Sequence, residues 1–264
     1  MLVDTHAHIH FDVFENDLDD IFAASKSNNI QSIITVGTDE ADSKSALEFV
    51  WNERVMERSA GIGLYATAGL HPHEAKRGED ALLTIKELVE SGGYDNKLVA
   101  VGECGLDYYR NKSEKKEQYK ALEFQLELAI NNGLPLIFHV RDAWDDFFSI
   151  IKYYSELRGV IHSFTGGPKE VEQAAEYNLY FGLNGIMTFT KEQSQLEAAK
   201  LVPSNKLLLE TDCPYLAPAP KRGKRNEPAN VKYIAEFLCK LRSQTYDQVS
   251  RRSTINAKTL FGIE

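Results

Sequence analysis

The stretch EKKEQYKALEFQLELAINNGLPLIFH, residues 114–139, carries a helix signal and a strand signal in direct succession. Its first half places apolar side chains three to four residues apart, the spacing of one helix face, at Tyr119, Leu122, Leu126 and Ala129. Asn132-Gly133 is typical of a helix end, and the apolar run Leu134–Phe138 after it predicts a buried strand. Residues 114–139 therefore predict a helix followed by a strand.

The same alternation extends over the whole chain of 264 residues. Eight strands are predicted, at Met1–Thr5, Ser32–Val36, Tyr65–Gly69, Leu98–Gly102, Leu134–Phe138, Gly159–Ile161, Leu179–Leu183 and Lys206–Thr211. Helical segments fill the gaps, including one over Asp39–Arg58, and two more close the chain. Eight strands alternating with helices predict a single-domain (β/α)₈ TIM barrel over residues 1–264, with the active site at the C-terminal ends of the strands.

An open, doubly wound sheet is the alternative, because periodicity alone does not show whether a sheet closes. The phosphate-binding glycine patterns typical of that fold are absent from the sequence. The stretch Pro214–Pro228, rich in proline, predicts a loop over one mouth of the barrel.

Composition indicates an acidic globular protein. The 30 basic and 39 acidic residues give a formal net charge of −9, which argues against a passive DNA-binding module, since such modules are usually basic. Three cysteines without a C-x-x-C spacing argue against a disulfide framework and favour a reducing, cytoplasmic location. The first residues lack the pattern of a signal peptide, and no apolar run is long enough to span a membrane.

All seven histidines fall close to the end of a predicted strand. Six candidate metal ligands are the polar residues that follow the apolar runs: His6, His8, Glu103, His139, His162 and Asp212. His6 and His8 are two residues apart, so both imidazoles point to the same side of the first strand. Asp4 shares that side and either holds the imidazole NH of a ligand histidine or makes structural hydrogen bonds at the end of the strand. Cys104 and Cys213 point the other way and are assigned to packing.

Four imidazoles and two carboxylates, without thiolates, suit zinc, manganese, nickel, iron or magnesium. Six ligands are too many for one tetrahedral zinc ion and fit two ions bridged by a carboxylate. We therefore expect two divalent metal ions per chain.

The residues at the strand ends resemble those of the TatD family of metal-dependent deoxyribonucleases, within the amidohydrolase-like barrels. The resemblance covers essentially the whole chain and rests on segments in a fixed order: Asp4–His8, Ala68–His73, Gly102–Tyr108, His139–Asp142, His162–Gly166, Glu210–Leu216, Arg225–Pro228 and Asn256–Phe261. It implies that His6, His8 and Asp212 bind one metal, that His139 and His162 bind the second, and that Glu103 bridges them. It also implies DNA as the substrate. His10 departs from the pattern, because relatives commonly carry Asp there, and its role stays open.

Two such ions would acidify a water and stabilise charge on a phosphoryl oxygen, so hydrolysis would need no covalent intermediate. Asp212 is the residue expected to accept or carry the proton of that water, with Glu103 as the second catalytic residue. The alternative role of Asp212 is that of a ligand alone. No obligate protein partner is inferred.

Candidates for substrate binding are His71, His73, Arg141, Tyr215, Arg222, Lys224 and Arg225. The run Lys221-Arg222-Gly223-Lys224-Arg225 concentrates four cations that could attract phosphates, or it is a solvated loop. His71 and His73 either contact a phosphate or form a structural turn. Tyr108, Tyr109, Phe164 and Tyr215 either stack on bases or pack within the protein.

Two other functions remain open at this point. The same dinuclear site could hydrolyse a carboxyl ester, lactone or amide, because the chemistry that attacks phosphorus also attacks a carbonyl carbon. A metal-binding scaffold without activity is the alternative outside enzymes.

Overall fold

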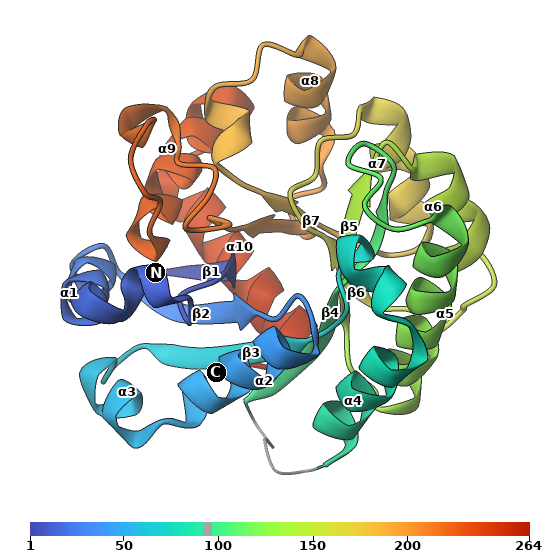
Figure 1. Cartoon of the computed structure of the whole chain (residues 1–264). Coiled ribbons are helices and arrows are strands. Elements are labelled where there is room, and N and C mark those ends of the chain that lie inside the picture. Colours follow the sequence, from blue (N-terminus) through green and yellow to red (C-terminus); the bar gives the residue numbers. More distant parts are fainter. Residues whose placement is uncertain (92–96) are drawn as a thin grey trace.

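Eight parallel strands lie side by side in the order in which they occur in the chain, and helices surround them (Figure 1). The structure is a computed structural model that describes residues 1–91 and 97–264. The strands are β1 (Leu2–Ala7), β2 (Ile30–Val36), β3 (Gly63–Ala68), β4 (Leu98–Asp107), β5 (Leu136–Arg141), β6 (Gly159–Ile161), β7 (Tyr180–Leu183) and β8 (Leu207–Leu209). This consecutive order confirms the barrel and excludes the doubly wound sheet, whose strand order reverses at a switch point.

The first and last strands come together at the residues that follow β8. An isolated parallel bridge joins Ala7 to Cys213, and the backbone N–H of Asp212 donates to the carbonyl of His6 at 2.8 Å. Asp4 accepts hydrogen bonds from the backbone N–H and the hydroxyl of Thr211, at 2.8 and 2.6 Å. The barrel is therefore closed at its C-terminal end by residues 211–213.

The helices follow the strands as the apolar spacing predicts. The α-helices are α1 (Leu18–Ser27), α2 (Glu40–Trp51), α3 (Glu53–Arg58), α4 (Gly78–Glu90), α5 (Lys115–Asn131), α6 (Trp144–Ile151), α7 (Pro168–Glu176), α8 (Gln193–Leu201), α9 (Val231–Arg242) and α10 (Tyr246–Phe261). Short 3₁₀ helices are η1 (Asp12–Asp17), η2 (Pro72–Arg77), η3 (Gly185–Thr188), η4 (Ala219–Lys221) and η5 (Pro228–Asn230).

Most predicted strand boundaries shift by one to three residues, as at β5, which ends at Arg141 and not at Phe138, and two differences are larger. The single helix expected over Asp39–Arg58 is divided into α2 and α3 at Asn52, whose side chain caps α3 by accepting from the N–H groups of Arg54 and Val55. The fourth strand ends at Asp107 and not at Gly102, because residues 104–107 continue to pair with β5. Within it, Gly105 has a φ of +142° and lies so close to β5 that a Cβ atom would be 2.0 Å from the carbonyl oxygen of His139.

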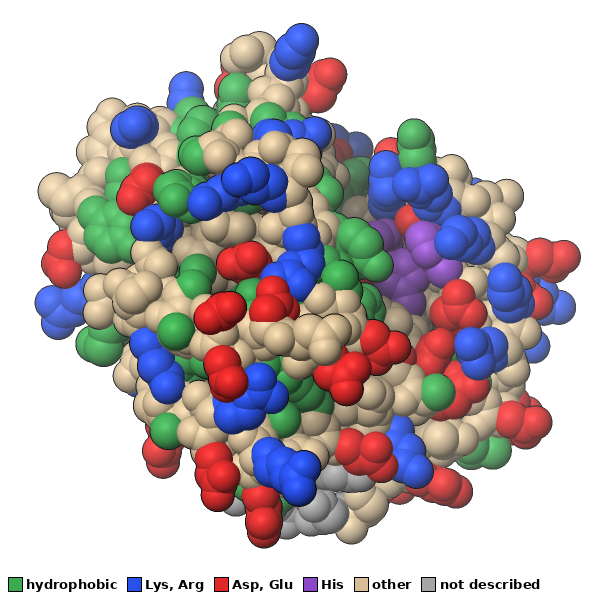
Figure 2. Space-filling model, turned by 60° about the vertical axis from the view of Figure 1, so that its left-hand side comes forward, with side chains coloured by type: hydrophobic (Ala, Val, Ile, Leu, Met, Phe, Trp, Pro, Cys, Tyr) green, Lys and Arg blue, Asp and Glu red, His purple; other side chains and the backbone are tan. Residues whose placement is uncertain are grey.

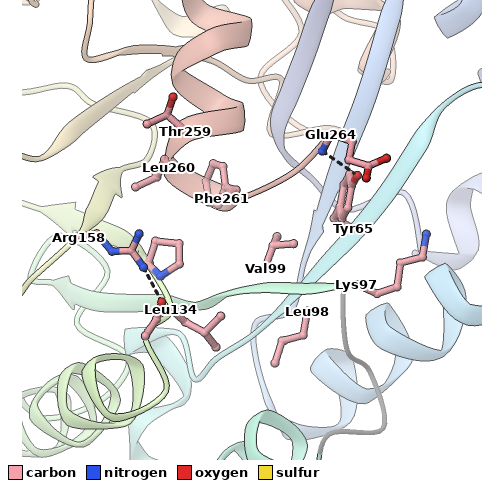
Figure 3. A pocket seen from close by; sticks show the side chains of 13 residues that line it. Tyr65, Lys97, Leu98, Val99, Leu134, Arg158, Thr259, Leu260, Phe261 and Glu264 are labelled. Atoms are coloured by element: carbon pink, nitrogen blue, oxygen red, sulfur yellow. Dashed lines mark hydrogen bonds between the residues drawn. The ribbon is translucent and has the colours of Figure 1, made fainter.

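The opposite end of the barrel, where the strands begin, is closed by the end of the chain. Leu260, Phe261 and Ile263 pack against residues from the strands, including Val99 and Ile137. A cavity of about 710 Å³ lies there between the end of α10 and the starts of β4 and β5 (Figure 3). Its cations Lys97 and Arg158 donate to backbone carbonyls, those of Leu64 and Gly133.

None of the helices within residues 1–91 and 97–264 combines the length and the apolar character needed to cross a membrane. Cys104, Cys213 and Cys239 are free thiols, and the first two are buried, as packing residues should be.

Candidate metal centre

A cavity of about 550 Å³ opens at the C-terminal ends of the strands. Figure 2 shows histidine side chains in a hollow of the surface, with lysine and arginine side chains beside it. The lining of this cavity includes many of the predicted site residues: His8, His71, His73, Glu103, His139, Arg141, His162, Asp212 and Tyr215. His6 is fully buried beside them, with its Nε2 3.4 Å from Glu103 Oε2.

The two carboxylate oxygens of Glu103 face different histidines. Oε2 lies near His6, whereas Oε1 lies 2.7 Å from His139 Nδ1 and 3.1 Å from His162 Nε2. His71 Nε2 is also 3.4 Å from Oε1. Glu103 therefore stands between His6 at one oxygen and three other imidazoles at the other.

Asp212 completes the group on the side of β1. Its Oδ1 lies 3.4 Å from His8 Nε2 and 3.8 Å from His6 Nε2. The φ of Asp212 is +57°, a left-handed conformation at the turn that closes the barrel. The side chains of β1 and the residue after β8 are thereby brought to the same place.

Three of these imidazoles are oriented by a partner on the ring nitrogen that faces away from the cluster. His8 Nδ1 is 2.8 Å from the carbonyl of Val36. His139 Nε2 is 3.1 Å from Asp107 Oδ2. His162 Nδ1 lies 3.3 Å from Glu210 Oε1, an ion-pair contact without hydrogen-bond geometry. A proton held on the outer nitrogen leaves the lone pair of the inner nitrogen free for a metal.

The predicted partner of an imidazole, Asp4, does not have that role. Its carboxylate accepts from Thr211 and from the backbone N–H of His6, so it connects β1 to the closing residues. Asp107 and Glu210 take the role instead, and the sequence reasoning missed both. Glu210 fits beneath β7 because Gly182 lacks a side chain there, since a Cβ atom would lie 2.1 Å from Glu210 Oε2.

The charges of the cluster follow from its burial and its composition. Burial opposes ionisation of Glu103, but the imidazoles of His162 and His71 outweigh it and hold the pKa of the carboxyl well below its usual value. Burial also opposes the negative charge on Asp212, but the imidazole of His8 and the other imidazoles nearby outweigh this effect and lower the pKa of the carboxyl. Conversely, Glu103 and Glu210 raise the pKa of His162 against the effect of burial, while burial lowers that of His6.

The donor set fits divalent metal ions. Groups of three donors that converge closely enough to hold an ion include His6 with His8 and Glu103, and His71 with Glu103 and His139. Both ring nitrogens of His6 are buried without a hydrogen-bond partner, which is costly unless another ligand is bound there. Imidazole and carboxylate donors are those of zinc, manganese and iron sites.

His71 and His73 form the start of η2, and they differ in their contacts. His71 Nδ1 accepts from the backbone N–H of His73 at 3.0 Å, so the proton of a neutral ring is on Nε2, toward Glu103. Burial and the imidazoles of His139 and His73 lower the pKa of His71 to about 4, which keeps it neutral. His73 Nε2 is 2.8 Å from Asp107 Oδ2.

His10, whose role the sequence left open, lies outside the cluster of donors. Its Nδ1 is 2.6 Å from Thr35 Oγ1 and its Nε2 is 2.8 Å from Asp42 Oδ1. Both ring nitrogens are thus occupied by residues of β2 and α2. His10 connects the segment after β1 to these two elements.

The basic run at residues 221–225 is not brought to this cavity. Arg225 binds the carboxylate of Asp17 and the carbonyl of Val13, and Arg222 lies over the ring of Phe189 at 3.8 Å. Lys221, Lys224 and Arg225 line a separate pocket. The cations in the lining of the metal cavity are Arg110, Lys112 and Arg141.

The sequence reasoning named Arg141 but missed Arg110 and Lys112. They follow Asp107 within five residues, and that position after a strand was the signal that could have found them. Of the aromatic candidates, Phe164 is buried in the core and Tyr108 hydrogen-bonds to Tyr119 and Asp146. Tyr109 and Tyr215 are more than half exposed, at 59% and 56%.

Comparison with known proteins agrees with this site and fold. The profile of the family described as "TatD related DNase" matches residues 3–262. An uncharacterized metal-dependent hydrolase of Bacillus subtilis, YabD, is 37% identical over the full length of both chains. The 3'-5' ssDNA/RNA exonuclease TatD of Escherichia coli is 32% identical over 95% of each chain.

Among solved structures, YjjV, a TatD homologue from Escherichia coli, superposes with a TM-score of 0.89 at 27% identity, covering 100% of this chain and 98% of the other. The match extends over the whole barrel, including every strand that supplies a residue to the cavity. The chain therefore belongs to the TatD family and is a metal-dependent hydrolase.

Proposed function

We propose that this protein is a dinuclear metal-dependent nuclease that cleaves phosphodiester bonds at the end of single-stranded DNA or RNA. The observation that carries the proposal is Glu103, whose Oε2 faces His6 and whose Oε1 faces His139 and His162. A carboxylate in this position can bridge two ions. Relatives named as 3'-5' ssDNA/RNA exonucleases share about a third of the sequence over 95% of the chain.

His6, His8 and Asp212 would hold one ion, and His139 and His162 would hold the other, with Glu103 between them. His71 is excluded from the ligand set although its Nε2 lies near Glu103, because that nitrogen carries the proton of the neutral ring. Divalent ions at such a centre acidify a water molecule and neutralise charge on phosphate oxygens.

The residues of the chain supply the remaining steps. Asp212 is ionised because the imidazoles around it lower its pKa, and its carboxylate accepts the proton of the attacking water. His71 is neutral, lines the cavity and carries its proton on Nε2, which lies 3.4 Å from Glu103 Oε1; with substrate bound, this N–H would donate to an oxygen of the scissile phosphate. Asp107 and Glu210 keep His139 and His162 in orientation.

Metal quantification combined with cleavage assays tests the proposal. The metal-free protein is loaded with zinc, manganese or magnesium and incubated with end-labelled single-stranded DNA, single-stranded RNA and duplex DNA. We expect two ions per chain and stepwise shortening of the single strands. A loaded enzyme that is inactive on every nucleic acid but hydrolyses a carboxyl ester or lactone would overturn the nuclease proposal while leaving the metal site intact.

The cytoplasmic location of the protein stays a prediction from its free cysteines.

A further inference from the structure

One side of the metal cavity is formed by three cations, Arg110, Lys112 and Arg141, which we call the cationic wall. They come from neighbouring strands, because Arg141 is the last residue of β5 and the other two follow β4. Arg141 is paired in register with Asp107, the last residue of β4. The wall is therefore built on the same two strand ends that carry Glu103 and His139.

The backbone and an aromatic ring hold this wall in place. Asp107 Oδ1 accepts from the backbone N–H of Arg110 at 2.7 Å, and the N–H of Tyr108 donates to the carbonyl of Arg141 at 3.0 Å. The guanidinium of Arg141 lies 3.9 Å from the centre of the Tyr109 ring, and that of Arg110 lies 5.7 Å from it. Cation–π contacts of this kind orient a guanidinium without neutralising it.

The three cations have no ion-pair partner among the carboxylates of the described residues. Most lysines and arginines of the described residues also lack such a partner, but these three lie together in the lining of the metal cavity, in a chain with nine more acidic than basic residues. Arg77, by contrast, contacts Asp39, Glu40 and Glu74. Three cations that converge on one cavity raise the local potential there and favour binding of an anionic ligand.

The other side of the cavity is aromatic. Phe11 and Tyr215 line it, and the Phe11 ring stacks on His8 with ring centres 4.9 Å apart. Phe11 is partly buried and Tyr215 is exposed. Cations on one side and accessible aromatic rings on the other are the two components of single-strand binding surfaces, because phosphates and bases are recognised separately there.

We propose that the cationic wall binds the phosphate next to the scissile one in a single-stranded polynucleotide, and that the terminal base stacks on the side formed by Phe11 and Tyr215. This inference rests on the proposed nuclease function and adds the path of the substrate. The cationic wall takes the phosphate-binding role that the sequence predicted for the basic run at residues 221–225. No cation of that run lines the metal cavity.

The test compares wild type with R110A/K112A, since both side chains are exposed and their removal leaves the core intact. The matched control is R251A/R252A, which removes two exposed cations from α10. KM is measured at several salt concentrations for short single strands, with either normal phosphates or one neutral methylphosphonate next to the scissile linkage.

We expect R110A/K112A to reduce the slope of log KM against log salt by about 1.4, since each lost contact with a single strand removes about 0.7. The methylphosphonate should raise the KM of wild type about tenfold, the effect of losing a charge-assisted hydrogen bond, and should add little in R110A/K112A. The control variant should behave as wild type does.

The inference is overturned if R110A/K112A keeps the salt slope and the methylphosphonate response of wild type, or if the control loses as much. Tighter binding of duplex than of single strand also overturns it. If wild type cleaves no nucleic acid, the proposed function fails separately. Fluorescence anisotropy with a labelled single strand then decides: binding that is lost in R110A/K112A supports the wall, and equal or absent binding in both proteins rejects it.

Discussion

Replacing Glu210 with glutamine removes a negative charge behind His162 and leaves the volume of the side chain almost unchanged. Glu210 is 1% exposed. Its Oε1 accepts from the backbone N–H of Ser163 at 2.6 Å and lies 3.3 Å from His162 Nδ1. A glutamine oxygen can keep the bond to Ser163, but it offers the imidazole a neutral acceptor in place of a carboxylate.

The expected cost is a 10- to 100-fold loss of metal affinity, the usual effect of removing the partner of a ligand histidine, or about 1.4 to 2.8 kcal/mol. His162 faces Oε1 of Glu103 and not Oε2, so the loss should fall mainly on one of two ions. If the affinity for both ions falls to the same extent, the proposal that each oxygen of Glu103 serves a different ion is wrong.

The affinity is measured by competition with a chromophoric chelator, at alkaline pH so that protons do not compete for the imidazole. The matched control is Glu172→Gln, an exposed position of α7. Thermal unfolding of the metal-free proteins shows whether the variant is folded. A folded Glu210→Gln protein that binds both ions as tightly as wild type would refute the positioning role.

Three further predictions concern the centre itself. Glu103→Ala should weaken the binding of both ions, and elemental analysis that finds one ion at full affinity would disprove the bridge. Asp212→Asn keeps an oxygen donor but loses the base, so kcat should fall about 10²-fold or more; near-normal turnover at normal metal content would leave Asp212 a ligand only. In the metal-free protein, burial lowers the pKa of His139 and His162, but nearby carboxylates outweigh it and raise both. Protons therefore compete with metal, and metal affinity should increase with pH through neutrality and beyond, with protons released on binding; a pH-independent affinity would contradict this.

The barrel and the position of the six candidate ligands at its rim could be predicted from the sequence because each depends on a short local pattern. An apolar run of three to five residues predicts a buried strand, and the first polar residue after it lies at the C-terminal rim. His139 and His162 follow this pattern, and parallel strands then bring such residues together. Neither step requires knowledge of contacts between distant parts of the chain.

The residues that sequence analysis missed depend on such distant contacts. Asp107 supports His139 only because β4 continues past Glu103 in pairing with β5. Arg225 was expected to face the substrate, but it is held by Asp17, which is 208 residues earlier in the chain. Local charge density did not reveal that this arginine had a partner, and it did not reveal that Arg110 had none among the described residues.

The closure of the barrel by residues 211–213 has a consequence for synthesis of the protein. His6 and His8 are synthesised before Asp212, which faces them and follows 206 residues after His6. At about 5–20 residues per second, that delay is roughly 10 to 40 s. During that interval the nascent chain has no complete centre, and a chain that stalls before residue 212 cannot acquire one. A complete centre can therefore form only after Asp212 has been synthesised.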